Sequence, residues 1–321
     1  MKQGIAVAGT ILVDKINEIS AYPNAGELTK IVGLSKSVGG CVPNVAVDLK
    51  RIDPKLTVQA VGFVGADEEG EFVKQILREN GVDIEKVATA DDKTSFTEVM
   101  SVVGGQRTFF TYAGANAQFG VDGSDWETLN VKMLHLGYFL LLDKIDNGDG
   151  EKLLKKLQGL GIKTSIDLVS ENSDRYAKVL PCLAYTDNLI INEVEAGQLT
   201  EIEPKRENLR AIAEKLRSYG VKERVIIHTP ELGVCLSAAG YTELASYDLP
   251  QGFIKGTTGA GDAFCAGALI GIYREYADRE ILALASSAAV AALSAADAVS
   301  GMREEKEIEK LCQNMERKKL C

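Results

Sequence analysis

Residues 256–264, Gly-Thr-Thr-Gly-Ala-Gly-Asp-Ala-Phe, place small residues, an acid and a predicted helix start next to one another. Residues without bulky side chains let a ligand approach the backbone, and the first N–H groups of a helix attract an anion. Gly259, Ala260 and Gly261 are therefore candidates for an anion-binding loop. Asp262 could take a proton from a nucleophile while the N–H groups stabilise the charge that develops. The alternative from these residues alone is that Asp262 only caps the helix.

Two further sets of polar residues accompany a strand end and a glycine turn. Asp14 follows the first apolar run closely, at the edge where open α/β sheets bind ligands. The pair Gly39 and Gly40 precedes a predicted helix, and Asn44 in its first turn could hydrogen-bond a polar ligand. Each feature alone is also typical of a solvated loop acid or of an ordinary turn before a helix.

Asn192 and Glu195 are three residues apart where a predicted strand passes into a helix. Both side chains can therefore face one point of the crevice at the sheet edge. An amide and a carboxylate at one point suit a phosphate and the water shell of Mg²⁺, which takes few carboxylates directly. The alternative is a helix cap with solvated glutamates.

The scaffold for these residues is predicted by apolar runs that alternate with amphipathic ones. The pattern indicates parallel strands linked by helices, that is, a doubly wound α/β fold with a mostly parallel sheet. Strands are expected at residues 4–9, 56–64, 131–136, 163–168, 186–191, 225–228, 233–237 and 241–247. Helices are expected at residues 67–80, 150–160, 207–219 and 303–315, and a helix of small residues follows the glycine segment up to residue 299.

Residues 94–113 depart from this pattern with a longer polar and apolar alternation. The alternation is divided by Gly104 and Gly105, which predicts an antiparallel hairpin. A short strand within residues 27–37 could join the hairpin in a small separate sheet, which is a candidate lid. We therefore expect a single domain over residues 1–321, with the lid inserted at about 14–38 and 94–114.

The composition argues against several functions. The net charge of −10 over 321 residues, without a long basic segment, disfavours nucleic acid and anionic membranes as partners. The N-terminus is typical of a first strand rather than of a signal peptide, and the apolar residues 281–299 favour a packed interior helix. The cysteines lack CxxC spacing and are expected to be reduced, mostly buried thiols of a cytoplasmic protein: Cys41, Cys182, Cys235, Cys265, Cys312 and Cys321.

Several catalytic classes lack their motifs. The glycine segment is not a Walker A loop, because no Gly-Lys-Ser or Gly-Lys-Thr closes it, and the first strand lacks a GxGxxG dinucleotide fingerprint. The only histidines, His135 and His228, form no HExxH motif, so a zinc site is not expected. No GxSxG elbow supports a serine hydrolase.

Three segments together resemble the ribokinase-like, or PfkB, carbohydrate kinases. They are residues 39–46 (Gly-Gly-Cys-Val-Pro-Asn-Val-Ala), 192–195 (Asn-Glu-Val-Glu) and 257–264 (Thr-Thr-Gly-Ala-Gly-Asp-Ala-Phe). With residues 9–14 they follow the family's order and spacing over nearly the whole chain. The resemblance implies a ribokinase-like fold with a small β lid over a sugar, and ATP·Mg²⁺ as the phosphoryl donor.

By position, the resemblance implies a role for each matching residue. Asp262 would deprotonate the acceptor hydroxyl, while Gly259, Ala260 and Gly261 would bind the transferred phosphoryl group; with Mg²⁺ these form a sufficient catalytic set. Sugar-binding residues would be Asp14, Gly39, Gly40 and Asn44. Beside the resemblance, Arg107 and Asn116 are further candidates on the acceptor side; Arg107 could contact a phosphate or carboxylate of the acceptor or be a solvated charge of the hairpin. Residues on the nucleotide side would be Asn192, Glu195, His228, Gly233 and Thr257, with Glu195 reaching Mg²⁺ through water.

Two positions depart from the family pattern. Gly256 stands where relatives commonly carry an Asp associated with a monovalent cation, so potassium activation is not expected. Residues 228–233, His-Thr-Pro-Glu-Leu-Gly, replace a common Thr-Leu-Gly-Glu-x-Gly on the adenine side. His228 could therefore face the nucleotide or simply end a strand.

The expected reaction is ATP-dependent phosphorylation of a primary hydroxyl of a small monosaccharide, such as ribose, fructose or a related ketose or sugar acid. A nucleoside kinase is the nearest alternative, and a non-catalytic sugar or nucleotide sensor on the same fold is another. An exposed lid sheet could also pair two copies into a homodimer, by analogy at the level of the fold. Substrate choice is expected to depend on residues of the lid: Phe96, Arg107, Phe109, Tyr112 and Asn116.

Overall fold

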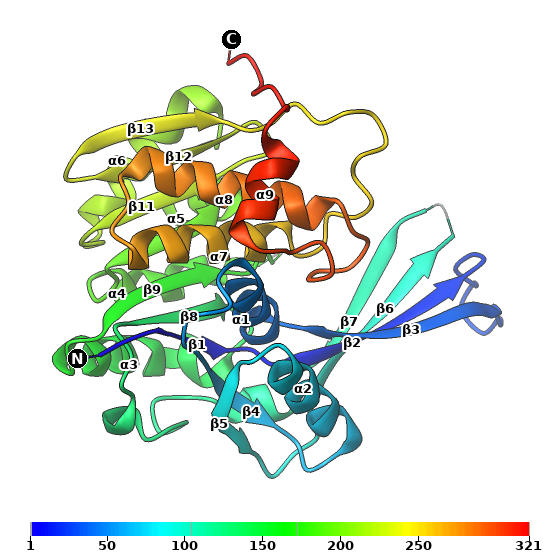
Figure 1. Cartoon of the computed structure of the whole chain (residues 1–321). Helices are drawn as coiled ribbons and strands as arrows, with labels where there is room; N and C mark the ends of the chain where they lie inside the picture. The colour runs from blue at the N-terminus through cyan, green and yellow to red at the C-terminus, as the bar shows by residue number, and fades with distance from the viewer. Residues whose placement is uncertain (1, 104, 172, 321) are drawn as a thin grey trace.

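The computed structural model describes residues 2–103, 105–171 and 173–320. Gly104 of the predicted turn and the thiol of Cys321 lie outside the described residues. Within the described part, a nine-stranded sheet runs through the centre of the molecule (Figure 1). Its order is β13 (Gly240–Ala245), β12 (Leu232–Ser237), β11 (Arg224–His228), β10 (Asn188–Asn192), β9 (Lys163–Leu168), β8 (Met133–Phe139), β1 (Ile5–Gly9), β4 (Val58–Val64) and β5 (Asp83–Thr89).

The sheet is parallel from β11 to β5, and only β12 and β13 are antiparallel to their neighbours. All five residues of β1 are buried, and the first four belong to two hydrophobic clusters. Ile5 and Val7 belong to one cluster, whereas Ala6 and Ala8 belong to the other, because alternate side chains point to opposite faces. Burial on both faces is typical of a parallel sheet covered by helices, which confirms the predicted doubly wound fold.

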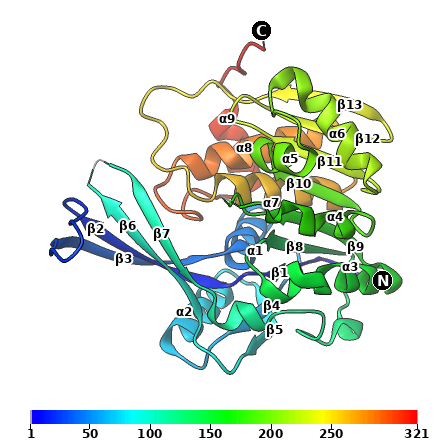
Figure 2. The same cartoon turned by 180° about the vertical axis from the view of Figure 1, so that it is seen from behind.

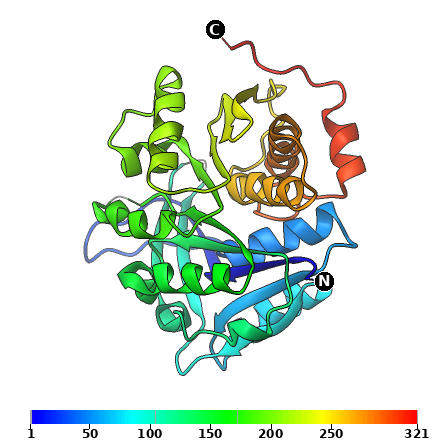
Figure 3. The same ribbon diagram turned by 90° about the vertical axis from the view of Figure 1, so that its left-hand side faces the viewer.

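Helices cover both faces of the large sheet (Figures 1 and 2). One face carries α1 (Cys41–Ile52), α2 (Glu68–Glu79), α7 (Ala260–Tyr273) and α8 (Asp278–Leu293), with α9 (Glu305–Cys312) against α8. The other face carries α3 (Gly150–Gly159), α4 (Leu180–Leu183), α5 (Glu193–Thr200) and α6 (Leu209–Ser218). Figure 3 shows these helices on either side of the strands. Short helical turns complete the connections: η1 (Gly114–Gln118), η2 (Trp126–Thr128), η3 (Ile145–Asp149), η4 (Arg175–Val179) and η5 (Arg206–Asn208).

The predicted helix of small residues is in fact two helices. Glu275 adopts a left-handed φ of 61° after α7, and the amide of Tyr276 returns to the carbonyl of Gly271, so the helix ends there. The following helix, α8, ends at Leu293 rather than at residue 299. The two helices pack closely at Gly267, which has no side chain. A Cβ atom there would lie only 2.8 Å from the Cα atom of Ala285. Among the described residues, no helix is long and apolar enough to span a membrane.

The described residues also form a four-stranded sheet that projects from the main body (Figures 1 and 2). We call this sheet the lid; its order is β3 (Ile31–Gly39), β2 (Leu12–Ile19), β6 (Ser95–Val102) and β7 (Arg107–Tyr112). Strands β6 and β7 form the predicted antiparallel hairpin. The sequence patterns did not indicate β2, which contains several charged residues, or the sheet edge β5, in which only Val87 is buried.

The strand register places a defined set of side chains on one face of the lid. Asp14 pairs with Ser37 and with Thr97, which in turn pairs with Thr111. Since side chains alternate along a strand, residues two and four positions further along share the face of Asp14. We call this the inner face of the lid. Residues paired across the strands form rows on this face, the first of which contains Asp14, Thr97 and Thr111. The next row contains Ile16, Val99 and Phe109, and the one after it Glu18, Ser101 and Arg107.

Candidate active site

The glycine segment forms the turn into α7. Gly259 is the N-cap residue with a φ of 80°, and a Cβ atom there would lie 2.5 Å from the Cα atom of Ala298. The left-handed backbone and the close approach both require glycine. No side chain of the described residues caps α7, so the N–H groups of Gly261 and Asp262 in the first turn have no helical partner. The segment has the geometry of an anion-binding loop, and its role in binding stays a prediction.

Asp262 is the third residue of α7, and its side chain does not cap the helix. The residue is 6% exposed, and its Oδ2 atom accepts hydrogen bonds of 2.9 Å from Nδ2 of Asn44 and of 2.9 Å from the hydroxyl of Tyr138. Burial and, secondarily, the charge of Asp167 raise the pKa of Asp262 to about 7. The alternative in which Asp262 only caps the helix is therefore wrong. A carboxyl group with this pKa can exchange a proton near neutral pH.

Asp14 lies inside β2 on the inner face of the lid, rather than in a loop after the first strand. A Cβ atom at Gly39 would lie 2.5 Å from Oδ2 of Asp14, so only glycine leaves room for this carboxylate. Burial raises the pKa of Asp14 to about 6, and its charge contributes to the raised pKa of Asp262. Gly40 has a φ of 87° at the start of α1, and Oδ1 of Asn44 is buried without a partner among the described residues. Of the predicted sugar-side residues, Asn44 thus contacts Asp262 directly, and Asp14 lies close enough to act on its pKa.

Asn192 and Glu195 form a capping box at the start of α5. Asn192 Oδ1 accepts the Glu195 amide at 2.9 Å, and Glu195 Oε2 accepts the Asn192 amide at 3.0 Å. Glu195 is 4% exposed rather than solvated, and Ser170 also donates to its Oε1 atom at 2.8 Å. Burial raises the pKa of Glu195 to about 8. The two residues do meet at one point, as predicted, but they meet as a buried cap.

Two residues beside Asp262, Tyr138 and Asp167, are absent from the sequence predictions. Asp167 lies near the end of β9, and its Oδ1 atom accepts the amide of Tyr138 at 2.6 Å. Tyr138 lies near the end of β8, where the register with β9 shifts between Leu136 and Phe139. Both residues follow apolar runs at the ligand-binding edge of the sheet, and this position is the signal that could have identified them.

A buried polar network continues behind Asp167. The possible ligand atoms of Cys41, His135 and Asp167 lie within 4.8 Å of one another, although the sequence spacing predicts no such cluster. His135 is hydrogen-bonded on both ring nitrogens, to Ser165 at 3.1 Å and to Asp167 at 3.2 Å. Burial raises the pKa of the Cys41 thiol well above its usual range. These contacts are those of a hydrogen-bonded core network. The described cysteines are free and buried: Cys41, Cys182, Cys235, Cys265 and Cys312.

Two adjoining cavities connect the site residues. The small pocket has a volume of about 180 Å³, and its polar lining includes Tyr138, Asp167, Asn192, Glu195 and Asp262. The large groove has a volume of about 590 Å³. The two cavities adjoin, because both are lined by Asn192, His228 and Gly261. The large groove has mostly apolar walls beyond this junction, which include Tyr247, Leu249, Ile254, Phe264, Val290 and Leu293.

Three of the predicted nucleotide-side residues occupy different places. His228 ends β11, stacks on Phe264 with ring centres 4.8 Å apart, and has its pKa lowered to about 4 by burial. Thr257 lines the large groove. Gly233 lines neither cavity, because it lies in β12 beneath Phe264, where a Cβ atom would come within 3.3 Å of the ring. Its close packing gives a structural reason for glycine.

The remaining two residues predicted on the acceptor side, Arg107 and Asn116, lie in different surroundings. Arg107 is exposed on β7, and its Nη1 atom donates a hydrogen bond of 3.1 Å to the hydroxyl of Thr258 in the glycine segment. Asn116 is buried in η1, where its Oδ1 atom accepts the amide of Ile11 at 3.1 Å. Asn116 therefore fixes the chain between β1 and β2, whereas Arg107 links the lid to the glycine segment.

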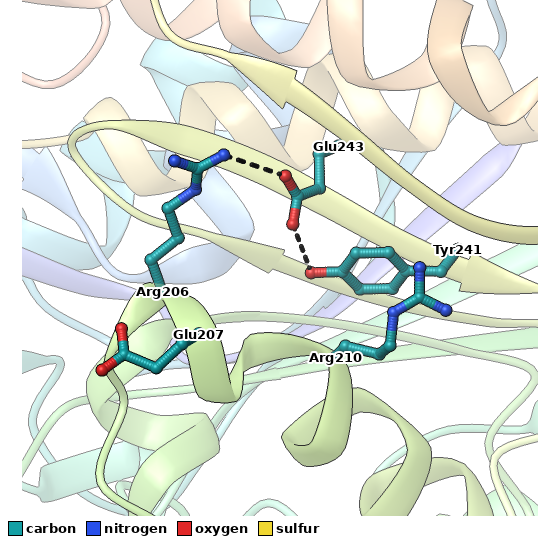
Figure 4. A pocket seen from close by; sticks show the side chains of 5 residues that line it. All are labelled: Arg206, Glu207, Arg210, Tyr241 and Glu243. Atoms are coloured by element: carbon teal, nitrogen blue, oxygen red, sulfur yellow. Dashed lines mark hydrogen bonds and ion pairs between the residues drawn. The ribbon is translucent and has the colours of Figure 1, made fainter. Parts of the chain in front are cut away.

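A third hollow lies elsewhere, beside the outer strand β13 (Figure 4). It has a volume of about 670 Å³. Glu243 accepts hydrogen bonds from Arg206 at 3.4 Å and from Tyr241 at 3.0 Å, and the guanidinium of Arg210 lies 4.3 Å from the Tyr241 ring centre. None of the predicted site residues lines this hollow, so the candidate active site is the small pocket and the large groove.

Comparison with known proteins agrees with this geometry. Residues 3–305 match the model of the pfkB family carbohydrate kinases, which is nearly the whole chain. The chain belongs to the pfkB family. Members of this family are sugar kinases, that is, phosphotransferases with an alcohol group as acceptor.

Relatives of this pfkB family kinase include proteins with different sugar substrates in their names. A ribokinase of Arabidopsis thaliana is 24% identical over 312 residues, which cover 96% of this chain and 80% of the relative. A 5-dehydro-2-deoxygluconokinase of Clostridium perfringens is 24% identical over 273 residues, covering 82% of this chain and 80% of that protein. The structure of Arabidopsis thaliana ribokinase with ribose and ATP superimposes with a TM-score of 0.83 at 22% identity, covering 97% and 99% of the two chains. The ribokinase fold is therefore established.

Gly256 is tightly enclosed in this pfkB family kinase. A Cβ atom there would lie 2.7 Å from the carbonyl oxygen of Ala296 and 3.1 Å from that of Ala295. An Asp side chain could not occupy this place without movement of the backbone. The expectation that potassium does not activate the enzyme stays a prediction.

Proposed function

We propose that this kinase transfers the γ-phosphoryl group of ATP to a hydroxymethyl group of a small monosaccharide, such as ribose, fructose or a related sugar. The observation that carries the proposal is the position of Asp262. Its carboxyl group is buried beside backbone N–H donors of the glycine segment and is hydrogen-bonded to Asn44, the predicted sugar ligand. A base next to an anion-binding loop is the arrangement that phosphoryl transfer to a hydroxyl group needs.

In the proposed reaction, Asp262 takes the proton of the acceptor hydroxyl as the acceptor oxygen attacks the γ-phosphorus. The new oxygen–phosphorus bond forms while the bond from the γ-phosphorus to the bridging oxygen breaks, and ADP leaves with that oxygen. The N–H groups of Gly261 and Asp262 would stabilise charge on the transferred group. Such catalysis depends chiefly on position and electrostatics.

The large groove is the proposed site for the adenosine part of ATP. Its apolar walls suit a flat base, and it shares Gly261 with the small pocket that Asp262 lines, so a nucleotide in it would extend its phosphates toward Asp262. Mg²⁺ would enter with ATP as part of the substrate. The oxygens of Glu195 are already engaged by Asn192 and Ser170, which fits contact through water better than direct coordination.

The acceptor is proposed to bind between the inner face of the lid and α1. Asp14 offers a carboxylate there, Asn44 has an unpaired buried oxygen, and Thr97 and Thr111 add hydroxyl groups on the same face. These groups suit the hydroxyls of a sugar. The names of the relatives support a monosaccharide or a related sugar derivative as the substrate class.

The first test measures ADP release with ATP, Mg²⁺ and a panel of pentoses, hexoses, ketoses, sugar acids and nucleosides. We expect turnover on a monosaccharide, and a loss of about a hundredfold or more in kcat when Asp262→Asn removes the base. The Glu243→Gln variant is a matched control, because it removes a carboxylate from the distant hollow beside β13.

Three other results of these assays would contradict the proposal. Turnover on nucleosides alone would replace the sugar with a nucleoside as the acceptor. A lack of turnover on every acceptor, together with ligand binding, would support a non-catalytic sensor. Near-normal kcat in the Asp262→Asn variant would exclude this residue as the base.

A further inference from the structure

Tyr138 makes a direct contact with the proposed base and has an unusual backbone. Its φ is 61°, a left-handed value that is uncommon for residues other than glycine and costs conformational energy. Its hydroxyl donates to Oδ2 of Asp262 at 2.9 Å. The left-handed backbone of Tyr138 therefore occurs where the tyrosine hydroxyl is directed at the carboxyl group of Asp262.

Two neighbouring features hold Tyr138 in this conformation. The amide of Tyr138 donates to Oδ1 of Asp167 at 2.6 Å, and Asp167 is held in turn by His135 at 3.2 Å. The register shift between β8 and β9 occurs at this point, and such irregularities turn a side chain away from its regular direction. A Cβ atom at the preceding Gly137 would overlap with Cys41, so the chain can only pass here with glycine.

The hydrogen bonds of Asp262 distinguish its two oxygens. Asn44 and Tyr138 both donate to Oδ2, and no described residue donates to Oδ1. An acidic oxygen with two donors is less basic, and donors fix the orientation of the carboxyl group. Oδ1 is consequently the oxygen that is available to an incoming hydroxyl group.

We propose that Tyr138 is a positioning residue, which together with Asn44 holds Oδ2 of Asp262 so that Oδ1 faces the acceptor hydroxyl. This inference rests on the proposed role of Asp262 as the base. Tyr138 acts through Asp262 and exchanges no proton with the substrate. Its hydroxyl stabilises the charged form of the carboxyl group, so it also sets the pH at which the base becomes active.

The test is the pH dependence of kcat in the Tyr138→Phe variant, from about pH 5.5 to about pH 9, with saturating ATP, Mg²⁺ and acceptor. Loss of one donor should move the acidic limb of the profile up by about one pH unit and lower kcat by about tenfold at neutral pH. The Tyr241→Phe variant is the matched control, because it removes a tyrosine hydroxyl that donates to Glu243 at 3.0 Å in the distant hollow. We expect an unchanged profile for that control.

The Tyr138→Gly variant is a second probe, since glycine adopts the same φ without strain. It should show the same shift of the acidic limb, even if loss of the ring changes its stability. Unchanged limbs in both Tyr138 variants, with Asp262→Asn inactive, would overturn the positioning role and leave the proposed function intact. An active Asp262→Asn variant would instead contradict the proposed function itself.

Discussion

Asp262 occupies a position that favours its neutral form in the folded protein. Burial and, next, the charge of Asp167 raise its pKa from 3.8 to about 7. The folded protein therefore keeps this proton between about pH 4 and about pH 7, whereas the unfolded chain releases it near pH 4. Stability must fall as the pH rises through this range, because the folded state binds more protons than the unfolded state.

The Asp262→Asn variant should consequently be more stable than the parent protein at pH 8, where the buried charge is removed. At pH 4 the difference should nearly vanish, because the parent carboxyl group is then neutral in the folded state and largely neutral in the unfolded state. Thermal unfolding at both pH values measures the difference in Tm. Equal Tm values at pH 8, or the same offset at both pH values, would contradict this explanation.

The residues of the site show what spacing along a chain can and cannot predict. Asp262 and Asn44 could be singled out from the sequence because each follows glycines at the start of a predicted helix, although one such turn alone is common. The structure brings the two side chains into contact. Tyr138 and Asp167 meet only through folding, and their segments carry no local signal beyond a strand end. Gly233 is the opposite case. Its sequence motif indicates a ligand contact, but in the structure the Phe264 ring fills the space beside Gly233.

At the scale of elements, the lid reaches the glycine segment through a single described hydrogen bond, from Arg107 on β7 to Thr258. Arg107 lies two rows beyond Asp14 on the inner face of the lid, at a distance along the strand of about 14 Å. Asp14 therefore lies near Asp262, whose pKa its charge helps to raise, while Arg107 reaches the glycine segment. A guanidinium there could pair with a phosphate more readily than with the sugar.

Replacing this arginine, Arg107→Ala, should lower kcat/KM by about tenfold, since a charged contact to the bound phosphates would be lost. Tm should change little, because an exposed contact contributes about 1 kcal/mol or less. The Lys30→Ala variant, which removes an exposed charge elsewhere in the lid region, is the control. If both variants keep the parent kcat/KM, the exposed side chain of Arg107 has no role in turnover.

The elements themselves were predicted best where they are buried. The central strands and most helices follow from apolar runs, because a covered parallel sheet needs them. The edge strand β5 and the lid strand β2 contain more exposed or charged positions and gave no such pattern. The break between α7 and α8 was missed because it depends on one left-handed residue, Glu275, and not on a glycine or proline.

For the whole molecule, the lid is the region where apolar side chains are most exposed. Leu34 is 77% exposed on β3, and Phe109 and Phe110 on β7 are 61% and 57% exposed. β3 and β7 are also the outer strands of the lid in the described structure, so each has one edge without a neighbouring strand. Exposed apolar groups on unpaired strand edges are typical of a surface that pairs with another chain. We propose that a second copy of this chain binds here.

Light scattering during size-exclusion chromatography should then give about twice the monomer mass of 34.5 kDa. The Leu34→Lys variant should shift the protein toward the monomer, because a charge would be brought into the apolar contact. The Gln313→Lys variant adds the same charge to an exposed position outside the lid and should remain dimeric. A monomeric parent protein would contradict the proposed pairing.

The register of the lid has a consequence for insertions and deletions. Asp14, Thr97 and Thr111 share one row, and the next residue on each strand points to the other face. One residue inserted at the start of β6, before Phe96, would therefore exchange the two faces of that strand and bring Phe96 and Glu98 to the inner face of the lid. Two inserted residues would restore the faces and only lengthen the strand. Changes in chain length at the start of β6 should therefore be tolerated in steps of two residues.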